Sequence, residues 1–217
     1  MREYDYLPGT ELILHQEKDM YHFNSDTAML GRFMKLKHSD RVLDIGCASG
    51  ALLLYAGMQK PAALYGIDLF EEVLDSCRKN LELNHMEASL ACTDLQHYSP
   101  GLQFDAIVCN PPYFRTENPE LKNRNPYLAA ARHESYLKPE DVFRHVRRLM
   151  KSDGRFFLVH RASRMSGLIL TAAGFGLQAV RIRPVCDSRS EYAKSILMEF
   201  RFGQGRETVI EKPVFLD

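Results

Sequence analysis

Apolar and polar positions alternate in blocks along most of the chain, and these blocks predict strands and helices in turn. Short apolar runs bounded by turn residues are typical of buried strands, whereas apolar residues spaced three or four apart are typical of helices. On this basis we expect strands at 41–46, 62–68, 89–94, 104–110, 154–160, 177–185 and 193–202. Helices are expected at 27–36, 49–59, 69–84, 139–150 and 162–174, and a long polar loop at 114–138.

Strands that alternate with helices predict an α/β fold with a mostly parallel, seven-stranded sheet and helices on both faces. Ahead of this pattern, residues 10–23 read as apolar run, polar turn and apolar run, which indicates a hairpin. The length of 217 residues suits one large domain. We therefore expect a hairpin extension over residues 1–23 and a single domain over residues 24–217.

The composition is that of an ordinary globular protein, with 45% hydrophobic and 26% charged residues. The net charge is zero, which argues against a strongly basic nucleic-acid binder. The charge is uneven, because residues 1–138 carry 14 Lys and Arg against 19 Asp and Glu, and residues 139–217 carry 14 against 9. The basic C-terminal part could hold a polyanion, although a solvated charge imbalance is the simpler explanation.

The five cysteines show no CxxC pair, so we expect reduced thiols and no metal site. The N-terminal residues lack the basic-then-apolar pattern of a signal peptide, and no apolar run reaches membrane-spanning length. These features predict a cytoplasmic protein with no membrane partner.

Parallel sheets bind ligands beyond the carboxyl ends of their strands, and polar residues gather there in this sequence. The first strand runs into DIGCASG, from Asp44 to Gly50. Glycines allow a tight turn and a close approach of the backbone to a ligand. The stretch is neither GxGxxG nor a P-loop, and its acidic start suits a cationic ligand better than a phosphate.

The next two strands also end in carboxylates. Asp68 is placed to accept hydrogen bonds from ribose hydroxyls. Asp94 is placed to hold the amino edge of an adenine, and the side chain of Leu95 to hold its face. Three acidic strand ends and a glycine loop describe a pocket for a nucleoside with a positive centre, which fits S-adenosylmethionine (SAM).

The fourth strand ends in Asn110-Pro111-Pro112-Tyr113. The prolines make a rigid corner with unpaired carbonyls. The side-chain oxygen of Asn110 and the carbonyl of Pro111 could each accept an N–H from an aryl amine, and Tyr113 could stack on the base. An ordinary Pro-Pro turn closed by a core aromatic is the alternative.

DIGCASG, Asp68 and NPPY together resemble the class I SAM-dependent methyltransferases that act on amino groups. The resemblance implies a Rossmann-like methyltransferase fold, SAM as cofactor, and a catalytic set of Asn110, Pro111, Pro112 and Tyr113. The cofactor-binding residues that it implies are Asp26, Asp44, Gly46, Cys47, Ala48, Gly50, Asp68, Leu69, Asp94, Leu95 and Asn110. Helix capping explains Asp26 and the adjacent Thr27 equally well.

Further motifs narrow the resemblance. FNSDTAMLGRFM at 23–34, NPPYF followed by ARHE at 131–134, and the closing strands RIRPV and AKSILMEF are similar to the bacterial tRNA1(Val) (adenine(37)-N6)-methyltransferases. This likeness spans roughly residues 10–215, although Cys186-Asp187 stands where that family usually has His-Pro. It implies N6-methylation of adenine 37 in a tRNA. The substrate-binding residues that we expect are Tyr113, Phe114, Arg132, His133, Arg181 and Arg183.

NPPY alone leaves the substrate open, since ribosomal RNA, DNA and release-factor glutamine are also modified by proteins with this tetrapeptide. A SAM- and RNA-binding protein without turnover is the alternative from a different class. The expected partner is a tRNA, and the expected state is a monomer or weak dimer.

Overall fold

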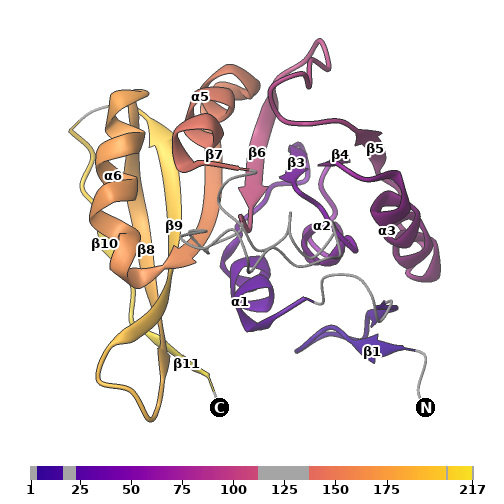
Figure 1. Ribbon diagram of the computed structural model, residues 1–217, viewed down its shortest axis with the longest axis horizontal. Helices are drawn as coiled ribbons and strands as arrows, with labels where there is room; N and C mark the ends of the chain where they lie inside the picture. The colour runs from indigo at the N-terminus through magenta and orange to yellow at the C-terminus, as the bar shows by residue number, and fades with distance from the viewer. Residues whose placement is uncertain (1–3, 17–22, 112–136, 204, 217) are drawn as a thin grey trace, which may run out of the picture.

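A computed structural model describes residues 4–16, 23–111, 137–203 and 205–216. Its centre is a nine-stranded sheet in the order β10-β8-β9-β7-β6-β3-β4-β5, with β11 also paired to β8 (Figure 1). The strands are β3 (Arg41–Ile45), β4 (Ala63–Asp68), β5 (Ser89–Cys92), β6 (Phe104–Cys109), β7 (Met150–Arg161), β8 (Leu177–Asp187), β9 (Ala193–Phe202), β10 (Val209–Ile210) and β11 (Val214–Leu216).

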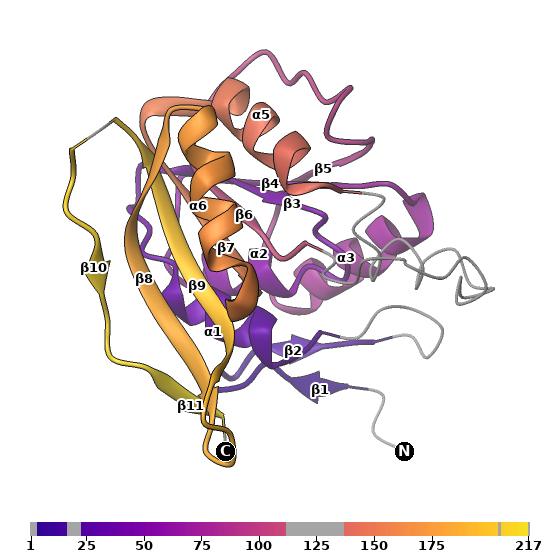
Figure 2. The same ribbon diagram turned by 60° about the vertical axis from the view of Figure 1, so that its left-hand side comes forward.

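The seven strands expected from the sequence form the body of this sheet, so the predicted fold class is confirmed. Strands β5, β4, β3, β6 and β7 are parallel, and β9 lies antiparallel between β7 and β8. The two short strands β10 and β11 were not expected, and both run parallel to β8 along its outer edge (Figure 2).

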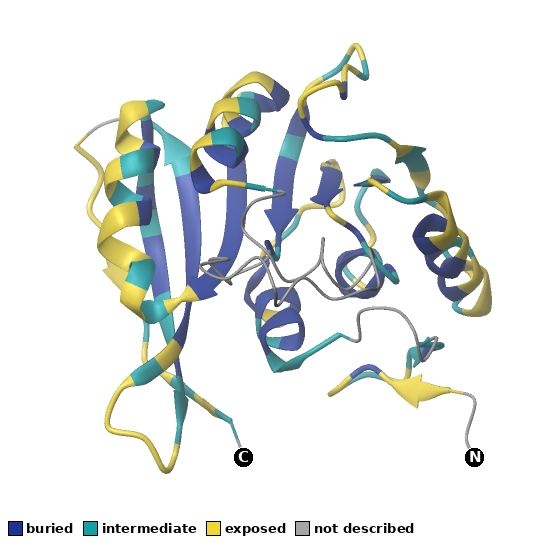
Figure 3. Cartoon of the chain, viewed as in Figure 1, coloured by how far each residue is buried: buried dark blue, intermediate teal, exposed yellow. Residues whose placement is uncertain are grey.

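Helices cover both faces of the sheet, as expected. They are α1 (Ser25–Phe33), α2 (Ala51–Gly57), α3 (Glu71–Leu83), α5 (Pro139–Leu149) and α6 (Met165–Gly174), with a 3-10 turn at Ala162–Arg164. Alternate residues of each strand enter two separate cores: Ala106 and Val108 pack with α1, α2 and α3, and Ile107 and Cys109 with α5. The central strands are therefore buried on both sides (Figure 3).

The N-terminal hairpin differs from the expectation. Strand β2 (Ile13–Leu14) lies within the expected apolar run, but it pairs antiparallel with the preceding β1 (Asp5–Tyr6). Residues 17–22, which include the expected turn, lie outside the described part of the chain. Within the described residues β2 thus pairs on its N-terminal side, which the apolar pattern did not reveal.

Asn80 in α3 and Asn84, the C-cap residue of that helix, attach this hairpin to the domain. The Asn80 carboxamide accepts from the His15 N–H (2.7 Å) and donates to the His15 carbonyl (3.0 Å). Asn84, one helical turn later, makes the same pair of bonds to Ile13, at 2.9 and 2.7 Å. Because a carboxamide carries both a donor and an acceptor, the two side chains act as a neighbouring strand for β2. Asn80 also donates to the Ser49 carbonyl in the glycine loop (2.9 Å).

Among the helices of the described residues, none combines the length and apolar character required to cross a lipid bilayer.

Candidate active site

The parallel register brings the predicted site residues to one edge of the sheet. Asp44 in β3 is level with Gly66 in β4 and Val108 in β6, and Ile45 is level with Ile67 and Cys109. The chain therefore leaves β3, β4 and β6 at nearly the same level. The glycine loop, Asp68 and Asn110 follow these three strand ends, so they lie at a shared edge.

The loop after β3 turns sharply because three of its residues have left-handed backbone conformations: Gly46 (φ 72°), Ala48 (φ 47°) and Gly50 (φ 86°). The N–H groups of Gly46 and Cys47 both donate to the Ile67 carbonyl, at 2.9 and 3.0 Å. A Cβ at Gly50 would lie 2.8 Å from the Cys77 sulfur, so the loop can pack on α3 only with glycine there.

Asp44 is the most unusual group of the site. It is 1% exposed, and neither carboxylate oxygen has a hydrogen-bond partner among the described residues. Burial raises the pKa of Asp44 well above its usual range, and the nearby charge of Asp68 raises it further. A buried carboxylate without a partner is costly, and a cationic group of a ligand would compensate it. The sulfonium and ammonium groups of SAM have the required charge.

Asp68 ends β4 and is held by the backbone. One carboxylate oxygen accepts from the Ala48 N–H (3.0 Å) and the other from the Leu69 N–H (2.8 Å). Burial raises the pKa of Asp68, and these backbone hydrogen bonds partly oppose the shift. Leu69 is 41% exposed, so an apolar side chain stands at the surface directly beside this carboxylate.

Asp94 and Leu95 fit the predicted adenine site less well. The Asp94 carboxylate accepts from the backbone N–H and from Nδ1 of His97, both at 2.8 Å, and these bonds lower its pKa. Leu95 is buried and belongs to the core on the α5 side of the sheet. The Leu95 side chain, which we expected to hold the face of an adenine, thus has little exposed surface. Leu69 is an exposed apolar side chain near this edge.

Cys47 also contributes little through its side chain. It is 3% exposed, and its pKa is raised well above the ordinary value by a hydrogen bond with Cys77 and by burial. The thiol is therefore neutral and sits in the core beneath the loop. Only the backbone of Cys47 is placed to meet a ligand.

Asn110 follows β6 and is oriented by helix α1. Its Nδ2 donates to the Thr27 hydroxyl at 2.8 Å. Thr27 is buried in the first turn of α1, and both its N–H and its hydroxyl donate to Asn24 Oδ1, at 3.1 and 3.3 Å. Asp26, beside it, is buried and accepts from the Ser195 hydroxyl in β9 (2.6 Å), which ties α1 to the sheet.

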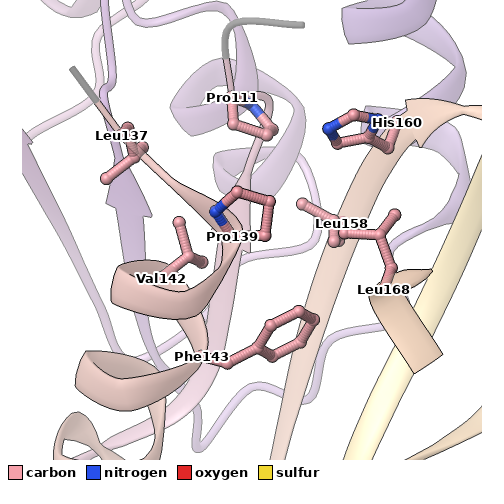
Figure 4. A pocket seen from close by; sticks show the side chains of 8 residues that line it. All are labelled: Pro111, Leu137, Pro139, Val142, Phe143, Leu158, His160 and Leu168. Carbon is pink, nitrogen blue, oxygen red and sulfur yellow. The ribbon is translucent and has the colours of Figure 1, made fainter. Parts of the chain in front are cut away.

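Pro111 lies beside a histidine that sequence reasoning missed. Pro111 and His160 line a cavity of about 10 Å³, room for about one water, whose other walls are apolar (Figure 4). His160 is 1% exposed, and its Nδ1 accepts from the Arg161 N–H (2.9 Å). Burial and the nearby Arg164 and Arg161 lower its pKa to about 4, so the imidazole is neutral. The available signal was its position at the end of β7, the strand next to β6.

Several predicted residues lie outside the described part of the chain. They are Pro112, Tyr113, Phe114, Arg132 and His133.

Arg181 and Arg183, which we expected to contact the substrate, have partners within the protein. Arg181 is buried: Nε donates to Glu199 (2.9 Å), Nη2 donates to the Phe33 carbonyl (3.0 Å), and the guanidinium lies 3.7 Å from the Phe33 ring centre. Arg183 pairs with Glu211 at 2.6 Å. These arginines join α1, the neighbouring strand β9 and the C-terminal segment.

In the described ranges, no three His, Cys, Asp or Glu side chains come together in an arrangement that could hold a metal ion.

The sheet is similar to those of solved methyltransferases. A predicted O-methyltransferase from Agrobacterium tumefaciens matches 88% of this chain and 86% of its own at a TM-score of 0.66 and 17% identity. The tRNA m1G37 methyltransferase of M.jannaschii matches 89% of this chain and 55% of its own at a TM-score of 0.66 and 14% identity. The fold, with its glycine loop and acidic strand ends, is that of the SAM-dependent methyltransferases.

Sequence relatives narrow this class. The chain belongs to the methyltransferase small domain family, whose model matches residues 20–175. The tRNA1(Val) (adenine(37)-N6)-methyltransferase of Shewanella halifaxensis is 30% identical over 63% of this chain and 56% of its own length. The protein of that name from Photobacterium profundum is 27% identical over 81% of this chain and 75% of its own. These relatives confirm the resemblance seen in the sequence, and SAM is the cofactor.

Proposed function

We propose that this protein transfers a methyl group from SAM to the exocyclic N6 of adenine 37 in tRNA1(Val). The observation that carries the proposal is the placement of Asn110 at the strand edge shared with Asp44 and Asp68, with its amide nitrogen bound by Thr27. The carboxamide oxygen is thereby kept as an acceptor for an amine. The relatives named tRNA1(Val) (adenine(37)-N6)-methyltransferases support the choice of adenine and of the tRNA.

The cofactor-binding residues differ in the part of SAM that each contacts. Asp44 is a buried carboxylate that compensates a cationic group, and Asp68 presents a carboxylate fixed by backbone donors to a ribose diol. Leu69 supplies apolar surface for the purine ring. When bound, SAM supplies an electrophilic methyl group on a positively charged sulfur.

An aryl amine is a weak nucleophile because its lone pair is delocalised into the ring. Hydrogen bonds from its N–H groups to the Asn110 Oδ1 and the Pro111 carbonyl strengthen as the nitrogen becomes tetrahedral and more positive. They therefore favour the transition state over the ground state. Attack requires no prior deprotonation, because the proton leaves after the N–C bond has formed.

The test is methyl transfer from tritiated SAM to bacterial tRNA that lacks the endogenous modification, followed by digestion and nucleoside chromatography. We expect N6-methyladenosine from the intact protein, located at position 37 of tRNA1(Val), and none from Asn110→Ala. A matched control is Asn84→Ala, which removes a carboxamide that contacts the N-terminal hairpin rather than the strand edge.

Other outcomes separate the alternatives. Labelled ribosomal RNA, DNA or release-factor glutamine with unlabelled tRNA would assign the enzyme to another substrate of the same chemistry. SAM binding without methyl transfer to any of them would contradict an enzymatic function and favour a SAM- and RNA-binding protein. The proposal places the protein in the cytoplasm with tRNA as its partner. We also propose that the protein is a monomer or weak dimer.

A further inference from the structure

The direction of the Asn110 carboxamide is determined by a chain of hydrogen bonds that begins at the backbone of α1. A carboxamide has two ends of nearly the same size, one an acceptor and the other a donor. Only the oxygen end can accept a proton from an amine. Whatever determines which end faces the substrate therefore determines whether Asn110 can serve the reaction.

The first link is unambiguous because a backbone N–H can only donate. The Thr27 N–H donates to the Asn24 side chain at 3.1 Å, the usual N-cap bond of a helix. The Asn24 atom at this position must be Oδ1. The backbone of the first helical turn thus fixes the orientation of the Asn24 carboxamide.

The second link follows from the first. The Thr27 hydroxyl lies 3.3 Å from the same Asn24 Oδ1, which can only accept. A hydroxyl has one proton to donate, so the Thr27 hydroxyl uses it here and offers only lone pairs elsewhere.

The third link reaches the site. Thr27 Oγ1 lies 2.8 Å from the near end of the Asn110 carboxamide. Since Oγ1 can only accept there, the near end of Asn110 must be the donor Nδ2, and Oδ1 is the far end. A flipped Asn110 would place two acceptors against each other and would present an NH₂ group to the amine.

We propose that Thr27 is a positioning residue for methyl transfer, which holds the Asn110 oxygen toward the substrate amine through the chain Asn24–Thr27–Asn110. The inference rests on the proposed function, because only an N–H-bearing substrate requires an acceptor at this point. Thr27 acts through Asn110 and makes no contact with the reacting atoms in this scheme. The Thr27 hydroxyl thereby links the N-cap residue of α1 to the chemistry at Asn110.

The test compares Thr27→Val, which keeps the shape and loses the hydroxyl, with Thr27→Ser, which keeps it. We expect kcat for N6-methyladenosine formation to fall between about 10- and 100-fold in Thr27→Val, as misplaced catalytic groups usually cause. KM for tRNA and the Kd for SAM, measured by calorimetry, should stay within about twofold, because the bond to the acceptor is weaker in the ground state than in the transition state. Thr27→Ser should recover kcat to within about threefold of the native value.

The matched control is Thr208→Val, which removes a threonine hydroxyl bound to the Ala179 carbonyl (2.8 Å) in the C-terminal part of the chain. It should leave kcat unchanged. Thermal unfolding of all variants identifies any that fail to fold, and those are excluded from the kinetic comparison.

The Asn110→Asp variant provides a second test of the inference. A carboxylate is an acceptor at both ends, so its direction does not matter. In Asn110→Asp, we expect the further change Thr27→Val to alter kcat by less than about threefold. An equal loss of kcat in both backgrounds would overturn the inference, as would a folded Thr27→Val protein with native kcat. If the native protein forms no N6-methyladenosine, the proposed function itself fails, which is a distinct result.

Discussion

Asp44 and Asp68 stand at the ends of two neighbouring parallel strands, and the charge of Asp68 adds to burial in raising the pKa of Asp44. The two carboxylates differ in their partners. Asp68 is held by two backbone N–H groups, whereas Asp44 has no hydrogen-bond partner among the described residues. When it is ionised, Asp44 thus has no compensating partner within the described part of the chain, and this has consequences for both stability and binding.

Replacing Asp44 with Asn should stabilise the protein and impair its function. Removal of an uncompensated buried charge should raise the free energy of unfolding by about 1–3 kcal/mol. For a chain of this size, each kcal/mol raises Tm by about 2–4 °C. The same change should weaken SAM binding at least about tenfold, because the cationic group loses its counter-charge. Thermal unfolding and calorimetric titration with SAM measure the two effects.

The control for this pair of measurements is Asp105→Asn. Asp105 is paired with Lys151 (2.7 Å) and accepts from the Arg41 N–H (2.9 Å), at the amino ends of the strands. The Asp105→Asn change should lower the free energy of unfolding and leave SAM affinity unchanged. Loss of stability in Asp44→Asn would contradict the assignment of Asp44 as uncompensated.

SAM affinity should depend on pH through Asp44. The pKa of Asp44 in the folded protein lies above its unfolded value, so the carboxyl takes up a proton as pH falls through this raised pKa. Protonation removes the counter-charge, and the Kd for SAM should rise. In Asp44→Asn the affinity should be weak and nearly flat over the same range. Calorimetry between about pH 8 and pH 5 follows the change, and proton uptake or release can be read from buffers of different ionisation heat.

His160 should make the protein sensitive to acid. Its folded pKa of about 4 lies below the ordinary value of 6.5, so the unfolded chain binds a proton first as pH falls. The contribution of neutral His160 to the free energy of unfolding is fully present above pH 6.5 and is lost as pH falls toward 4. The expected loss between about pH 8 and pH 5 is about 2 kcal/mol. Urea unfolding at both pH values measures it.

The matched variant is His160→Gln, which cannot titrate in this range. The fall in its unfolding free energy between the two pH values should be smaller than that of the native protein by about 2 kcal/mol. Equal losses in the two proteins would show that other groups cause the acid sensitivity.

Arg181 should be a stability residue rather than an RNA contact. Arg181→Ala removes one of the two arginines that pair with the buried Glu199, the other being Arg201, and should cost about 3 kcal/mol. Changing the exposed Arg189, which pairs with Asp187, to Ala should leave the stability nearly unchanged, because solvent screens an exposed ion pair. At a temperature where Arg181→Ala is folded, its tRNA affinity and the salt dependence of that affinity should equal those of the native protein. A weaker salt dependence of tRNA affinity in Arg181→Ala than in the native protein would show that Arg181 does contact the RNA.

Much of the fold could be predicted because each central strand is a short apolar run and each helix a longer amphipathic one. β10 and β11 could not be predicted, since strands of two and three residues leave no periodic pattern. They form only because the edge of β8 is available. The hairpin register was also hidden, because its attachment uses Asn80 and Asn84, which lie 65 and 71 residues beyond their partners.

The site shows the same division between local and distant information. Asp44, Asp68 and Asn110 could be located from the sequence because each lies at or next to the carboxyl end of a strand, and parallel strands end at one edge. The hydrogen bond between Thr27 and Asn110 joins residues 83 positions apart, and no local sequence pattern predicts it. Arg181 and Arg183 were assigned to one face of their strand, but the sequence did not reveal that Phe33 and Glu211 cover that face.

The anchoring of α1 determines when the protein can become active during synthesis. α1 is made early, yet Asp26 at its start is bound by Ser195, 169 residues later. The hydrogen bonds that attach the β2 segment can likewise form only after Asn80 and Asn84 have been synthesised. Since the ribosome extends the chain by only about 5–20 residues per second, the helix that orients Asn110 gains this contact with the sheet seconds after its own synthesis. A nascent chain that stops before β9 can contain every cofactor residue and still lack this support for the catalytic asparagine.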